Sequence, residues 1–144
     1  MSKAKLDRQG NYIYIGVYDC EMDVVGLLGE VGTANGHVFF PWAQEKDAPK
    51  ARHSKVRGMC YVTVGLDQRY WSECIEILLH EILEYEFVRM NVRYNNSSNL
   101  YDSAARHSFN MTHEQYGESV AKIAPWLTRA MPALKKLWKR NIKI

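Results

Sequence analysis

Cysteine is scarce in this chain of 144 residues, and long hydrophobic runs are missing. The three cysteines, Cys20, Cys60 and Cys74, are an odd number and form no CxxC motif. A disulfide framework and a thiolate zinc site are therefore not expected, and a reducing compartment fits. No apolar run approaches the roughly 20 residues of a membrane helix. The first residues also lack the apolar segment of a secretion signal, so we expect a cytoplasmic protein with no membrane partner.

Acidic residues are missing from the end of the chain. The net charge is only +3, which does not by itself predict nucleic-acid binding. Residues 134–144, however, contain five cations and no acid. One interpretation is a helix packed on the domain with a solvated basic face. The other is a nucleic-acid-binding surface formed by Lys135, Lys136, Lys139 and Arg140.

Residue patterns predict strands in the first half of the chain. Aromatic and β-branched residues alternate in the first predicted strand, and the last has high β propensity. Residues 23–32 are ambiguous between a strand and glycine-punctuated turns, and the charged residues 44–58 read as an exposed loop. The predicted strands are residues 11–20, 36–40 (stopped by Pro41) and 59–66.

A helical pattern of apolar residues follows the predicted strands in the second half of the chain. Apolar residues recur at helical spacing from Trp71 to about Val92, and the polar, asparagine-rich residues 93–109 read as a loop. Thr112 and Gln115 form a capping box for a helix that runs to about Ala124. Prolines at 125 and 132 predict breaks before a last, basic helix.

This order of elements predicts a single α+β domain over residues 1–144. We expect a small antiparallel sheet packed on a central helix, with further helices at the C-terminus. Residues 1–66 should be mostly strands and loops, and residues 67–144 mostly helices.

Chemistry-bearing residues lie on the predicted central helix, in "ILLHEILEYEFV" at residues 77–88. His80 and Glu84 are four positions apart and project from one helical face. An imidazole and a carboxylate so placed suit a zinc ion. Glu81 flanks them, as the general base does in H-E-x-x-H peptidases. A buried carboxylate in this apolar helix also needs a partner, and a metal ion can supply one.

A third ligand is expected from the helix capped by Thr112, where His113 occupies the first position. His107 is an alternative, and Glu114 or Glu118 would serve if a glutamate completes the site. His113, His107, Glu114 and Glu118 all remain candidates for the third ligand.

The motif H-E-x-x-E on this helix, followed by "FNMTHEQYGESVAKIA", resembles a family of small phage and prophage proteins that are predicted zinc metallopeptidases of a minimal zincin-like type. The resemblance covers roughly residues 60–124, and the loop before His113 is longer than in the simplest members. It implies zinc bound by His80, Glu84 and His113, with Glu81 catalytic, a peptide or protein substrate, and the cytosol of the host cell.

Within this interpretation His107 either donates a hydrogen bond to the developing oxyanion, orients a ligand, or is a surface histidine. The competing hypothesis is a non-catalytic interaction protein of phage type, with a structural metal or none, that binds a host factor or nucleic acid. A closed site with four protein ligands favours that alternative, whereas an open water position favours an enzyme.

Overall fold

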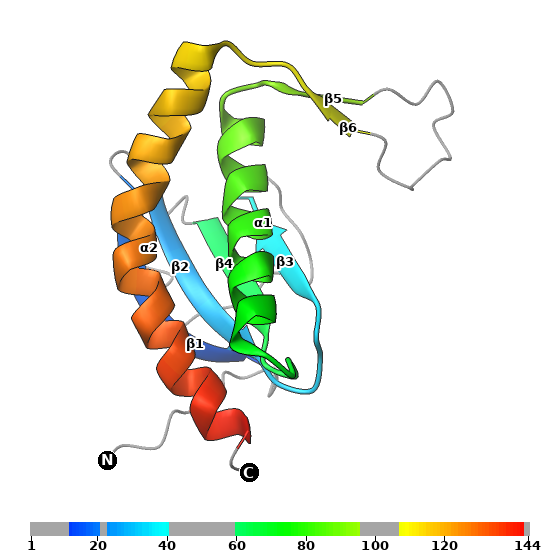
Figure 1. Cartoon of the computed structure of the whole chain (residues 1–144), viewed down its shortest axis with the longest axis vertical. Helices are drawn as coiled ribbons and strands as arrows, with labels where there is room; N and C mark the ends of the chain where they lie inside the picture. Colours follow the sequence, from blue (N-terminus) through cyan, green and yellow to red (C-terminus); the bar gives the residue numbers. More distant parts are fainter. Residues whose placement is uncertain (1–11, 21–22, 41–59, 96–106, 143–144) are drawn as a thin grey trace.

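Four strands form the main sheet of the molecule, and two long helices cover one of its faces (Figure 1). The computed structural model describes residues 12–20, 23–40, 60–95 and 107–142. This is an α+β architecture, as predicted. The elements in chain order are β1 (Tyr12–Cys20), β2 (Asp23–Glu30), β3 (Gly36–Phe39), β4 (Cys60–Gly65), α1 (Trp71–Arg89), β5 (Arg93–Asn95), β6 (His107–Phe109) and α2 (His113–Ile142).

The strand order in the main sheet is β1-β2-β4-β3, and the sheet is mixed. β1 pairs antiparallel with β2, and β3 pairs antiparallel with β4. β2 and β4 run parallel, so the expectation of a purely antiparallel sheet is wrong for this pair. β4 lies between β2 and β3 instead of at an edge of the sheet. Its near-continuous burial is typical of a strand in a parallel pair.

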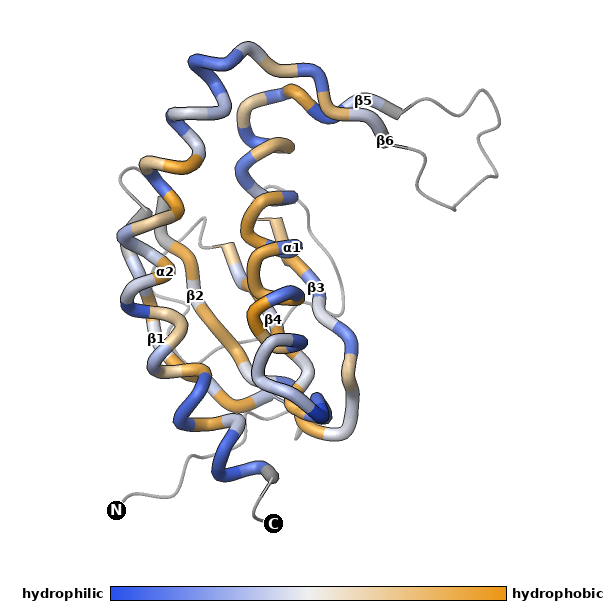
Figure 2. Tube along the Cα trace, in the orientation of Figure 1, coloured by the Kyte–Doolittle hydropathy of each residue, from blue (hydrophilic) through white to orange (hydrophobic). Residues whose placement is uncertain are grey.

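Both helices bury their apolar sides against this sheet. α1 contacts β3 and β4, α2 contacts β1 and β2, and the helices contact each other. Figure 2 shows that β2 is hydrophobic along most of its length beneath them. Alternate residues of β4 face the helices because side chains of a strand alternate between faces. The core joins Val62 and Val64 of β4, Leu78 and Ile82 of α1, and Trp126 of α2.

α2 is one continuous helix, which corrects the predicted breaks at Pro125 and Pro132. A proline inside a helix costs about 3 kcal/mol. Both prolines are exposed, and the opposite side of the helix buries an apolar stripe that includes Trp126, Ala130 and Leu134. Each large buried side chain contributes about 1.5–3 kcal/mol, which offsets the two prolines.

The start of α2 is capped as predicted. The Thr112 amide donates to Gln115 Oε1 at 2.9 Å, and the Gln115 amide donates to Thr112 Oγ1 at 3.1 Å.

The predicted loop at 93–109 contains two strands. β5 and β6 form a small antiparallel hairpin, while residues 96–106 lie outside the described part of the chain, as does the predicted loop at 44–58. Among the described residues, no helix combines the length and the apolar character needed to cross a membrane.

Candidate metal centre

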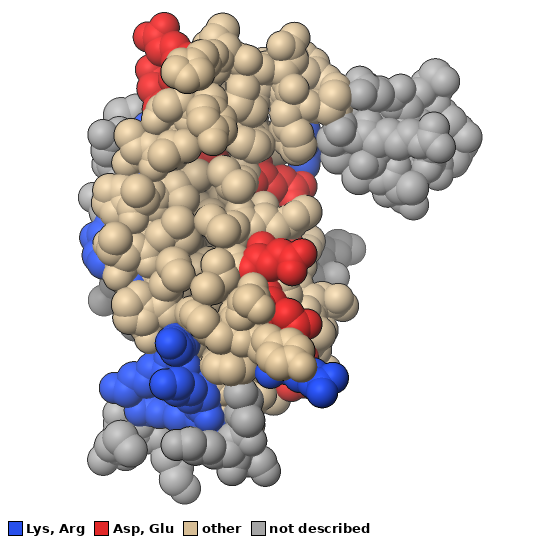
Figure 3. Space-filling view, in the orientation of Figure 1, with Lys and Arg blue, Asp and Glu red and all other residues tan. Residues whose placement is uncertain are grey.

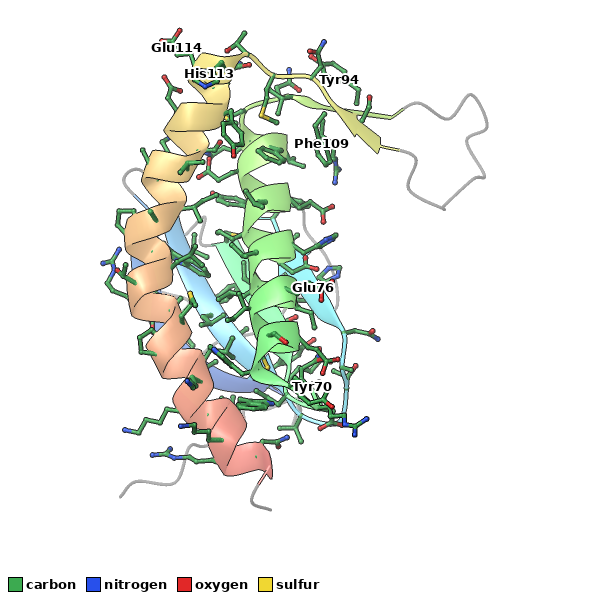
Figure 4. The ribbon with its side chains drawn as sticks, viewed as in Figure 1. Tyr70, Glu76, Tyr94, Phe109, His113 and Glu114 are labelled. Atoms are coloured by element: carbon green, nitrogen blue, oxygen red, sulfur yellow. The ribbon has the colours of Figure 1, made fainter. Side chains whose placement is uncertain are left out.

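Three side chains of α1 come together at the middle of the helix: His80, Glu81 and Glu84, which we call the α1 cluster. One ligand atom of each lies within 4.8 Å of the others. His80 Nε2 and Glu84 Oε2 are 3.6 Å apart. Two neighbouring ligands of a tetrahedral zinc ion are separated by about 3.4 Å, given bonds of about 2.1 Å. The two α1 ligands are therefore spaced as zinc would require. Glu76, labelled in Figure 4, lies one helical turn before His80 and locates the cluster on the ribbon.

Glu81 is the buried member of the cluster. The residue is only 8% exposed, and among the described residues its carboxylate has no hydrogen bond or ion pair. Burial raises the pKa of Glu81, and the nearby charge of Glu84 raises it further; His80 and His37 act in the opposite direction. Low exposure and a neighbouring carboxylate both disfavour the charged form of Glu81, so the position favours either a proton or a cation beside it.

The two oxygens of Glu84 have different neighbours. Arg93 of β5 donates to Glu84 Oε1 at 2.7 Å, which leaves Oε2 on the side of His80. A hydrogen-bonded carboxylate of this kind is typical of metal ligands, because the outer partner fixes its orientation. Nothing in the predicted loop at 93–109 distinguished Arg93 from the other polar residues around it.

Strand β3, at one edge of the sheet, runs beside the cluster. A Cβ placed on Gly36 would lie 3.3 Å from Glu81 Cγ and closer still to the side chain of Ile77. His37 follows on the same strand, and its charge lowers the pKa of Glu81. The absence of a side chain at Gly36 therefore lets the edge strand approach the buried carboxylate. Residue patterns identified β3 but did not show that it lies at this helix.

His113 is at the first position of α2, as predicted, but the structure does not bring it to the α1 cluster. Ser119 Oγ contacts Met90 Sδ at 3.4 Å, so these two residues lie at the same height along the two antiparallel helices. His80 lies ten residues from Met90 on one side, and His113 lies six residues from Ser119 on the other. At 1.5 Å per residue they are about 24 Å apart along the helix axes. Figure 4 shows His113 at the outer end of α2.

Glu114 and Glu118 are exposed on the same first turns of α2. They also lie outside the α1 cluster, which contains only His80, Glu81 and Glu84 among the described residues. His107 begins β6 and pairs with Asn95. Its side chain lies outside the described part of the structure.

No protein-family model matches the chain, and neither a curated protein nor a solved structure is significantly similar to it. The interpretation of the α1 cluster therefore depends on its geometry.

The basic residues of the chain's end gather far from the cluster. Lys135, Lys136 and Lys139 are exposed and Arg140 is half-buried on the last turns of α2. Figure 3 shows Lys and Arg side chains together at this end of the molecule, whereas acidic side chains follow the outer side of α1. The stripe between the basic residues is packed into the core through Leu134, Leu137 and Trp138. One side of α2 is thus packed into the core, and its solvated side is basic.

Proposed function

We propose that this protein is a zinc-dependent hydrolase of the metallopeptidase type, with the α1 cluster as its centre. The observation that supports this most strongly is the α1 cluster itself: the carboxylate of the largely buried Glu81 lies beside an imidazole and a second carboxylate, with one ligand atom of each within 4.8 Å of the others. A divalent cation would balance both charges. Imidazole nitrogen and carboxylate oxygen are the donor set of zinc.

Each cluster residue has a role in this proposal. His80 Nε2 and Glu84 Oε2 bind the ion, and Arg93 holds the other oxygen of Glu84 in place. When bound, zinc lowers the pKa of a coordinated water to about 7 and polarises a carbonyl. Glu81 accepts the proton of the attacking water and delivers it to the leaving amine. Its raised pKa suits both halves of that transfer.

The edge strand β3 offers a peptide a place beside Glu81. Among the described residues it is the last strand of the sheet, and an edge strand can pair through its backbone with an extended chain. A bound peptide would then run past the cluster with its amide bonds close to Glu81. This supports a peptide or protein as the substrate.

A catalytic zinc site usually has three protein ligands, so another element must supply one. The test is the zinc content of the purified protein and of four histidine variants: His80→Ala, His107→Ala, His113→Ala and His37→Ala. We expect about one zinc per chain in the native protein, loss in His80→Ala, and retention in His113→Ala, which is the control. Loss in His107→Ala or in His37→Ala would identify the third ligand. Native protein that binds no zinc would contradict the proposal.

Catalysis has a separate test. Glu81→Gln should retain zinc and abolish peptide hydrolysis, because glutamine cannot accept the proton. Normal hydrolysis by this variant would exclude Glu81 as the base. Loss of zinc from it would make Glu81 a ligand instead. A carboxylate in place of a second imidazole also leaves the ion less positive, so we expect slow turnover.

A second candidate function, nucleic-acid binding, is favoured by the basic end of α2. Lys135, Lys136 and Lys139 are exposed side by side, with no acid in residues 125–142. If these and Arg140 contact about four phosphates, the logarithm of the DNA affinity should fall with the logarithm of salt at a slope of about −3 to −4. The triple variant Lys135→Ala, Lys136→Ala, Lys139→Ala should flatten that slope. Unchanged binding in the triple variant would exclude this surface.

We propose that the protein acts in a reducing cytoplasm. Cys74 is a buried, free thiol, and such thiols persist where disulfides do not form.

A further inference from the structure

The β5–β6 hairpin rests on the end of α1 through one of its faces. Arg93 and Phe109 are partners in the antiparallel register, so their side chains leave the same face of the hairpin. Arg93 bonds to Glu84, and the ring of Phe109 lies 5.1 Å from the ring of Phe87 on α1. That face of the hairpin is therefore directed at the helix that contains the α1 cluster.

Phe87 continues the helical stripe of the cluster. His80, Glu84 and Phe87 occupy positions i, i+4 and i+7, which lie on one face of a helix. Phe87 is about 4.5 Å along the axis beyond Glu84. Phe109 covers Phe87 but remains 48% exposed. An open aromatic surface thus lies directly beside the Glu84 end of the cluster.

We infer that Phe109, supported by Phe87, is a subsite for an aromatic side chain of the peptide substrate; this rests on the proposed function of the α1 cluster. An extended peptide advances about 3.3 Å per residue. Phe87 lies six residues, about 9 Å along the helix axis, beyond Glu81. With one amide at Glu81, a side chain about three positions away therefore reaches the ring of Phe109. Aromatic rings prefer offset-stacked or edge-to-face contacts with one another, so the subsite selects Phe, Tyr or Trp over aliphatic residues.

The chain offers a matched control on the same hairpin. Tyr94 is 48% exposed, the same fraction as Phe109. It pairs with Ser108 and leaves the opposite face of the hairpin. Figure 4 shows the two side chains on β5 and β6, with Phe109 on the side of α1. Substitution of either removes a half-exposed aromatic ring, but only Phe109 is at the proposed subsite.

The experiment measures peptide binding in the full-length, zinc-supplemented Glu81→Gln protein, so that hydrolysis does not consume the probe. The probes are fluorescent six-residue peptides of alanine, with one phenylalanine moved through the positions. We expect one position at which phenylalanine binds about three- to tenfold more tightly than alanine. Phe109→Ser should reduce that ratio to about one, and Tyr94→Ser should leave it unchanged.

Equal affinity for all peptides, or no measurable binding, would overturn the inference. So would a preference that survives Phe109→Ser, or one that Tyr94→Ser also removes. Cleavage of the same peptides by the chain that retains Glu81 is measured in parallel. Binding that depends on Phe109 without any cleavage would refute the proposed hydrolytic function and leave the aromatic subsite standing.

Discussion

Replacing Gly36 with alanine tests the closest approach between the sheet and the candidate site. The new methyl group would collide with the side chain of Ile77 and lie 3.1 Å from the Thr63 carbonyl oxygen and 3.3 Å from Glu81 Cγ. The backbone of Thr63 belongs to the central strand β4 and cannot yield. Ile77 must therefore change its rotamer, or α1 must move away from β3.

Overpacking of this kind costs about 1–3 kcal/mol of the free energy of unfolding. For a domain of this size that corresponds to a melting temperature lowered by about 3–10 °C. Gly117→Ala is the control, because nothing lies within 4 Å of a Cβ there. Alanine in place of that helical glycine should stabilise the protein by about 0.5–1 kcal/mol. The same chemical change is thus expected to act with opposite signs at the two positions.

Urea unfolding of a double-mutant cycle measures the effect. Ile77→Ala removes the methyl group that the new Cβ would meet, so it should relieve the Gly36→Ala penalty by about 1 kcal/mol or more. A neutral Gly36→Ala variant, or strictly additive effects of the two substitutions, would refute the close approach of β3 to α1.

Three further predictions concern the surroundings of the site and the core. Gly65→Ala should destabilise the protein by about 3 kcal/mol, more than Gly36→Ala, because its Cβ would meet the backbone of Thr33, Ala34 and Asn35 rather than a side chain; a melting temperature equal to the native one would contradict this. Burial raises the pKa of Cys74 to about 12, so at pH 8 its alkylation should be about a thousandfold slower in the folded protein than in urea, and rapid native labelling would show that the thiol is accessible. Arg93→Ala should cost about 1 kcal/mol and speed amide exchange in β5 and β6, with partial rescue by Arg93→Lys; unchanged exchange would mean that the Glu84 contact does not hold the hairpin on α1.

Local features of the fold were predictable from the residues. The apolar spacing that begins at Trp71 locates α1, and the Thr112–Gln115 capping box locates the start of α2. Both signals involve residues within one or two turns of each other. The proximity of His80 and Glu84 is of the same kind, since helical geometry alone sets it.

Long-range features were not predictable. The parallel pairing of β2 with β4 depends on which strand inserts between two others. The continuity of α2 through two prolines depends on the apolar surface beneath it. The hairpin that brings Arg93 to Glu84 lay in a segment whose composition is that of a loop.

The sequence by itself determined that an imidazole and two carboxylates share one stretch of helix, because their spacing is shorter than two helical turns. Only the tertiary structure decided their neighbours: Gly36 of an edge strand beside Glu81, Arg93 on Glu84, and His113 at the far end of another helix. The physical reason is that side-chain spacing within a helix is set by local hydrogen bonds, whereas the placement of one element against another is set by burial over the whole core.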